Sequence, residues 1–234
     1  MGMFLSMTGV IGRTKDEVVS SLTRYAQSVS GGLEKANLPI NHDNCCVFSE
    51  TNGNTTIFNP YAFLEWDRSS EFISRDLNAP VFSFHIHDGD FWMYTLFVKG
   101  ETIDQFNPIP DYWEDNPGED ELRKWKGNAA TIHRVLGYVK PADIEKYLVR
   151  WDLDDEVSKK AYPDDEYEQE DWQLLDFMKK LDLSYPLNED GTPKGETYKL
   201  WTKDLPLQPY TPQSAGETGL SDGNSSGKPW WKFW

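Results

Sequence analysis

The clearest pattern in the chain is an alternation of apolar and polar residues near its middle. The alternation runs through Val81–His87, resumes in Phe91–Val98 and continues in Glu101–Phe106. Asp88-Gly89 and Lys99-Gly100 separate these runs, and glycine-containing pairs of this kind suit the tight turns of β-hairpins. The pattern therefore predicts a three-stranded meander.

The first of these predicted strands has one apolar and one polar face. Its apolar members are Phe82, Phe84 and Ile86, and its polar members are Ser83, His85 and His87. Successive side chains of a strand point to opposite faces of a sheet. We therefore expect helices on one face only, and an α+β fold with a small antiparallel or mixed sheet.

Two helices and a hairpin are expected before the meander. Thr14 stands three residues before Glu17, the spacing of a capping box at a helix start. Apolar residues then recur at helical spacing: Val18, Leu22, Tyr25, Ala26 and Val29. Cys45–Ser49 and Thr55–Phe58 flank an Asn-Gly-Asn turn and predict a hairpin. A second helix is expected within Asp67–Leu77.

The second half of the chain is acidic and is predicted to be mainly helical. Helices are expected at Asn128–Leu136, at Pro141–Trp151 and around Trp172–Leu181. The expected organisation is an α+β sheet domain (1–110), an acidic helical part packed on it (111–183), an extended Pro-rich segment (184–212), a flexible linker (213–227) and an aromatic tail (228–234).

Composition narrows the class of protein. The 234 residues include 39 acidic and 23 basic ones, a net charge of -16, and residues 111–182 carry 20 of the acids and 11 of the bases. Such a surface repels phosphate backbones, so nucleic acid is not an expected partner. The mean hydropathy is -0.66, and no apolar run approaches the length of a membrane helix. No secretory leader pattern opens the sequence, so we expect a cytoplasmic protein.

One cluster could carry chemistry. His85 and His87 share a strand face, and Asp88 and Asp90 stand at the end of that strand. Histidine and carboxylate ligands of this kind bind zinc or iron, so a metal-dependent hydrolase is the alternative functional reading. The other interpretation is that Asp88-Gly89 serves only the hairpin turn. The two cysteines are adjacent and cannot form a disulfide framework, and no cofactor is expected.

The segment Asp104–Trp113 is the most distinctive in the chain, and it reads DQFNPIPDYW. Together with Asp88–Tyr94 upstream and residues 127–137 and 144–151 downstream, it resembles a group of uncharacterised bacterial proteins. The resemblance covers about residues 67–190. It implies an accessory or interaction role, comparable to immunity-type proteins, and it brings no established activity. The motif itself is typical of a structural corner, and Tyr112 and Trp113 leave it as candidate contact residues.

The leading interpretation is a non-enzymatic interaction protein. Four large aromatic residues lie within the last five positions: Trp230, Trp231, Phe233 and Trp234. With Lys228 and Lys232 they suit a hydrophobic pocket on a protein partner, and less well the headgroup zone of a membrane. The acidic helical part is expected to attract a partner with a basic surface. We expect Tyr162 and Tyr167 to be exposed there and to act as anchors for that partner.

Overall fold

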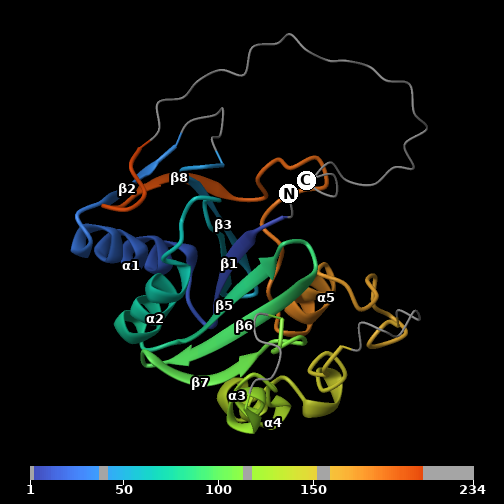
Figure 1. Ribbon diagram of the computed structural model, residues 1–234. Helices are drawn as coiled ribbons and strands as arrows, with labels where there is room; N and C mark the ends of the chain where they lie inside the picture. The colour runs from blue at the N-terminus through green and yellow to red at the C-terminus, as the bar shows by residue number, and fades with distance from the viewer. Residues whose placement is uncertain (1–2, 37–41, 113–117, 152–158, 208–234) are drawn as a thin grey trace, which may run out of the picture.

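The computed structural model describes residues 3–36, 42–112, 118–151 and 159–207. These residues contain one eight-stranded antiparallel sheet, with the order β2-β8-β3-β4-β1-β5-β6-β7 (Figure 1). The strands are β1 (Leu5–Val10), β2 (Gly32–Lys35), β3 (Cys45–Thr51), β4 (Asn54–Phe58), β5 (Pro80–His87), β6 (Phe91–Val98), β7 (Glu101–Phe106) and β8 (Glu196–Trp201). The predicted α+β class is confirmed, although the sheet is larger than expected.

Six helical elements accompany the sheet in the described part of the chain. They are α1 (Lys15–Ser28), α2 (Trp66–Leu77), α3 (Glu119–Lys124), α4 (Ala129–Leu136), the 3₁₀-helix η1 (Pro141–Asp143) and α5 (Gln173–Lys180). None of these helices is long and apolar enough to cross a membrane.

The turn residues in the sequence predicted the positions of the hairpins correctly. The predicted meander is β5, β6 and β7, and the predicted first hairpin is β3 and β4. Asp88 and Gly89 have φ angles of 54° and 75°, and the Asn52-Gly53 and Lys99-Gly100 turns also have positive φ at both residues. Two such residues in a row define the hairpin turn whose twist matches that of its strands.

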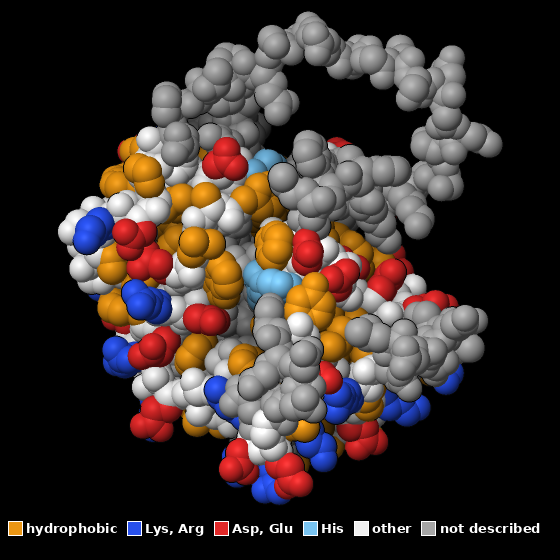
Figure 2. Space-filling view, in the orientation of Figure 1, with side chains coloured by type: hydrophobic (Ala, Val, Ile, Leu, Met, Phe, Trp, Pro, Cys, Tyr) orange, Lys and Arg blue, Asp and Glu red, His pale blue; other side chains and the backbone are white. Residues whose placement is uncertain are grey.

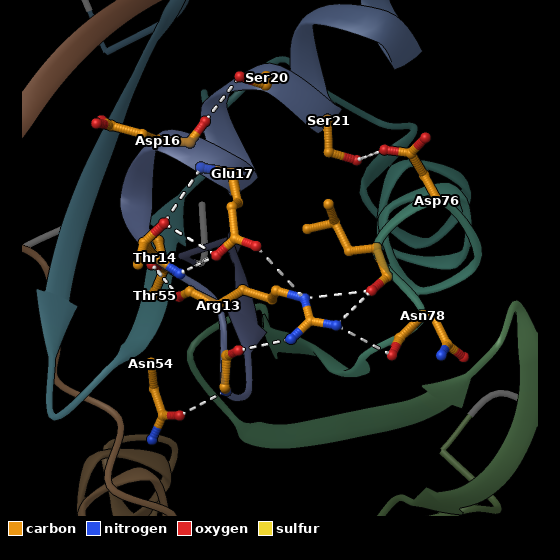
Figure 3. Close-up of polar contacts among 12 residues, drawn as sticks. Arg13, Thr14, Asp16, Glu17, Ser20, Ser21, Asn54, Thr55, Asp76 and Asn78 are labelled. Atoms are coloured by element: carbon orange, nitrogen blue, oxygen red, sulfur yellow. Dashed lines mark hydrogen bonds and ion pairs between the residues drawn. The ribbon is translucent and has the colours of Figure 1, made fainter.

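The first helix begins at the predicted capping box. The Thr14 hydroxyl accepts from the Glu17 backbone N–H, and the Glu17 carboxylate accepts from the Thr14 N–H at 2.9 Å. Arg13, just before this cap, donates to the backbone carbonyl of Leu77 from Nε at 3.2 Å and from Nη2 at 2.6 Å (Figure 3). Leu77 ends α2, so the arginine satisfies a free carbonyl at that helix terminus and joins the two helices.

Helices cover both faces of the sheet, so the expectation of helices on one face is wrong. One apolar core lies between the sheet and the pair α1 and α2, and a second lies between the sheet and α5 with the chain around residues 132–151 (Figure 1). The polar positions of the strands are small enough to be buried: the Thr8 and Ser70 hydroxyl oxygens are 3.0 Å apart beneath α2, and Ser83 is buried beside them in the sheet. In β5 itself, Ser83 and His85 are buried, so the polar face of this strand is not open to solvent.

The Pro-rich segment supplies a strand to the sheet. It was expected as an extended segment laid over the body, but residues 196–201 form β8, which lies between β2 and β3. Close approach of the backbones requires glycine at both ends of this strand. A Cβ atom on Gly195 would lie 1.8 Å from the Phe48 carbonyl oxygen, and one on Gly31 would lie 1.9 Å from that of Trp201.

In the acidic part, α4 and α5 confirm two predicted helices, but the expected helix Pro141–Trp151 is wrong. Only η1 forms, and turns follow it. The Tyr147 N–H donates to the Ile144 carbonyl at 3.1 Å, a bond between residues three apart, as in the tight turns of a 3₁₀-helix. Both side chains are fully buried, and the Tyr147 hydroxyl donates to Asp165 at 2.6 Å. Burial of this pair fixes the turns in place of a regular helix.

Part of the acidity is structural. The Asp176 carboxylate is buried and accepts from the backbone N–H groups of Glu166 and Tyr167 at 2.9 and 2.7 Å. Asp165 is buried as well and accepts from the Tyr162 N–H at 2.8 Å. Two lysine ammonium groups lie 4.9 and 5.2 Å from the centre of the Tyr162 ring. Tyr162 and Tyr167 are therefore half-buried within the fold, and not exposed as expected.

Candidate functional site

An aromatic cleft opens where three separate segments of the chain meet. Its volume is about 430 Å³. The lining residues come from the start of β1, the turn before α2, and the β5–β6 hairpin: Phe4, Leu5, Ser6, Tyr61, Leu64, Trp66, His85, His87 and Met93. Figure 2 shows pale-blue histidine side chains set among orange hydrophobic ones on this side of the molecule.

Strand register brings the first and third segments together. β1 and β5 pair in antiparallel fashion, with Leu5 opposite Ile86 and Ser6 opposite His85. Side chains two residues apart on a strand share a face, so His85 and His87 both face the cleft. The predicted common face of the two histidines is thus confirmed.

The turn before α2 exposes a leucine. The Phe63 side chain is buried. The backbone N–H of Phe63 donates to the Pro60 carbonyl at 3.0 Å, and this hydrogen bond fixes the turn. The Tyr61 N–H donates to the His42 carbonyl at 3.0 Å. Leu64 projects outward with 78% of its surface exposed, the largest exposure among the large apolar side chains of the described residues. Phe4 and Tyr61, which line the same cleft, are exposed as well, and a contiguous exposed apolar patch of this kind is typical of a binding surface.

His85 forms the floor of the cleft and is held neutral. Its ring stacks on Trp66 with centroids 4.8 Å apart and planes 7° apart, and only 9% of its surface is exposed. Burial, as the main cause, and nearby His87, as a smaller one, lower the pKa of His85 to about 4, while the Leu5 backbone acts in the opposite direction. The Nδ1 atom of His85 is shielded from solvent and has no hydrogen-bond partner in the described part of the chain. The ring thus contributes an uncharged aromatic surface to the cleft.

His87 continues the aromatic surface toward Tyr112. The His87 ring lies 4.9 Å from that of Phe4 in an edge-on arrangement and 5.5 Å from that of Tyr112. The Tyr112 hydroxyl donates to the Asp90 carboxylate at 2.8 Å, and this hydrogen bond raises the pKa of Tyr112. Tyr112, a predicted contact residue, is 38% exposed beside the cleft.

The four candidate metal ligands do not converge. Asp88 occupies the positive-φ position of the hairpin turn, and Asp90 accepts the Tyr112 hydroxyl. Among the residues that the structure describes, no group of three or more His, Cys, Asp or Glu side chains could hold a metal ion. His85 and His87 contact aromatic rings instead, so this geometry lends no support to the hydrolase reading.

The remaining predicted site residues lie outside the described residues. These are Trp113 and the four C-terminal aromatics Trp230, Trp231, Phe233 and Trp234. Conversely, sequence reasoning missed Phe4, Tyr61, Leu64 and Trp66, which build most of the cleft wall. The signal for Tyr61, Leu64 and Trp66 was weak, because they form an apolar and aromatic run directly after Asn59-Pro60, where the predicted strand ends; Phe4 lies in a separate short apolar run near the N-terminus.

A second hollow of about 380 Å³ lies beside α5. Part of its charged rim is already paired, because Lys179 contacts Glu166 at 3.2 Å and Asp176 at 3.1 Å. We therefore take the aromatic cleft as the candidate site. Comparison of the chain with protein-family models, curated proteins and solved structures found no match.

Proposed function

We propose that this protein is a non-enzymatic interaction protein, of an accessory, adaptor or immunity-like kind, and that it binds a protein partner through the aromatic cleft. The observation that carries the proposal is the exposed Leu64 beside a cleft walled by Phe4 and Trp66. Exposed aromatic and aliphatic side chains around a hollow are the usual anchors of protein recognition. Stacked and neutral, His85 adds a flat uncharged ring.

The cleft's chemistry defines the partner. An aromatic side chain of the partner would stack on the rings that line the cleft. The segments that line the cleft, 4–6, 61–66 and 85–93, contain three acidic residues and no lysine or arginine, and Arg68, just beyond the second segment, pairs with Glu65. A partner segment with both aromatic and basic side chains therefore complements this surface.

The net charge of -16 supports the same partner class. It disfavours nucleic acid, since phosphate backbones are repelled, and it opposes approach to an anionic membrane surface. Tyr112 and Trp113 extend the proposed contact beyond the cleft. The aromatic residues Trp230, Trp231, Phe233 and Trp234 provide a second proposed contact with the partner.

A photo-cross-linker at position 64 tests the proposal. The protein with p-benzoyl-phenylalanine in place of Leu64 is expected to cross-link one defined protein in its native host, because that side chain projects from the cleft rim. The matched control places the same group at Val149, which is 38% exposed on a separate part of the chain. The cross-linked protein is identified by mass spectrometry, purified and rebound in vitro. Equal labelling from both positions, or no rebinding, would contradict the proposal.

A further inference from the structure

We propose that, when no partner is bound, residues 228–234 of the same chain occupy the aromatic cleft, with a tryptophan of that segment seated between Phe4, Leu64 and His85. This inference rests on the proposed function, because it concerns what the same cleft binds. It makes the cleft a self-occupied site from which a partner must displace the chain's own segment.

The cleft sets two chemical requirements for its occupant. Aromatic walls call for flat apolar side chains, which Phe4, Tyr61 and Trp66 can contact. The acidic flanks of the cleft, which include Asp88 and Asp90 beside His87, call for positive charge.

Residues 228–234 meet both requirements. The segment reads KPWWKFW and contains four aromatic side chains and two lysines without an acid. Lys228 and Lys232 supply the positive charge. Few other segments of this acidic chain combine these features, and none of those that line the cleft does.

The end of the described chain is connected to the cleft through two intermediate residues. The Asn44 side chain donates to the Pro206 carbonyl at 3.1 Å, and two residues before Asn44 the His42 carbonyl accepts from the cleft residue Tyr61 at 3.0 Å. The His42 and Tyr61 rings are 5.7 Å apart. Residue 206 is thus separated from Tyr61 by only a short stretch of contacting residues.

The chain between residues 207 and 228 is long enough for this contact. About 20 residues span at most about 70 Å when fully extended. A folded body of about 200 residues has a radius of gyration near 16 Å and hence a diameter of about 40 Å. A segment tethered in this way has an effective concentration on the order of millimolar at the cleft, so its own cleft outcompetes that of a second copy at micromolar concentration.

Cross-linking within the purified full-length protein tests the inference. With p-benzoyl-phenylalanine at position 64, we expect an intramolecular cross-link that mass spectrometry maps to residues 228–234, in a yield independent of protein concentration. The same group at position 149 is expected not to give it. A yield that rises with concentration and runs as a dimer would assign the contact to a second copy and overturn the inference. Absence of the cross-link would overturn it too.

A peptide measurement separates this inference from the proposed function. The probe is a synthetic peptide of residues 228–234, and the protein is full-length with Trp230, Trp231, Phe233 and Trp234 all replaced by alanine. We expect the peptide to bind this variant at least about tenfold more tightly than the wild type, whose cleft is occupied. Equal affinity for both proteins overturns self-occupation but leaves partner binding standing. If position 64 also gives no cross-link to a partner protein, the proposed function is contradicted as well.

Discussion

Replacing Phe177 by alanine is expected to lower the free energy of unfolding by about 3–5 kcal/mol. Phe177 is one of the fully buried residues of α5, and it packs against the sheet. Its ring lies 5.1 Å from that of Trp92 and 5.5 Å from that of Tyr94, which it parallels within 8°. The Tyr147 ring lies 5.6 Å from it. Alanine would remove these contacts and leave a cavity between the layers.

Urea unfolding measures this change, as a shift of the midpoint at unchanged slope. The matched control is Leu175→Ala on the same helix, where the side chain is only half-buried and the expected loss is about 1 kcal/mol or less. Equal losses in the two variants would show that α5 does not seal the second core, and the two-sided arrangement of the helices would then be wrong.

The His85 side chain is expected to make stability depend on pH between pH 6.5 and 4. Its pKa is about 4 in the folded protein and about 6.5 in the unfolded chain. The folded state therefore excludes the proton that the unfolded chain binds. The stabilisation is complete above pH 6.5 and is lost as the pH falls toward 4. Linkage gives a loss of about 2 kcal/mol by pH 5, and on the order of 3 kcal/mol in full.

The comparison with His85→Phe isolates this effect, because phenylalanine cannot titrate and can still stack on Trp66. Free energies of unfolding are measured for both proteins from pH 7.5 to 5. We expect the wild type to lose about 2 kcal/mol more than the variant over this range. Parallel curves for the two proteins would mean that His85 is not buried as a neutral ring.

The features that were predicted correctly from the sequence are those that depend on neighbouring residues alone. The turns at Asn52-Gly53 and Asp88-Gly89 require residues that accept positive φ, and the capping box at Thr14 marks a helix start by its own hydrogen bonds. These signals need no knowledge of distant segments, so the strands of both hairpins and the first helix were predicted correctly.

The features that were not predicted depend on contacts between distant segments of the chain. β8 pairs with β2 and β3, which lie about 150 residues earlier in the chain, and its Pro-rich surroundings concealed it. The buried polar face of β5 depends on α2, whose first residue, Trp66, stacks on His85. In the same way, the cleft joins Phe4, Leu64 and His85 from three segments, and only the fold brings them together.

The central claim is that the aromatic cleft is the partner-binding surface. Its most direct test is the dissociation constant of the purified, cross-link-identified partner, measured by calorimetry. The protein carries alanine at Trp230, Trp231, Phe233 and Trp234, so that the chain's own segment does not compete. On this background, Leu64→Ser is expected to weaken binding by about tenfold or more, since a buried leucine contributes about 1.5–3 kcal/mol. The matched Val149→Ser change is expected to alter it by less than about twofold. Equal affinity of the Leu64→Ser protein and its parent would contradict the claim.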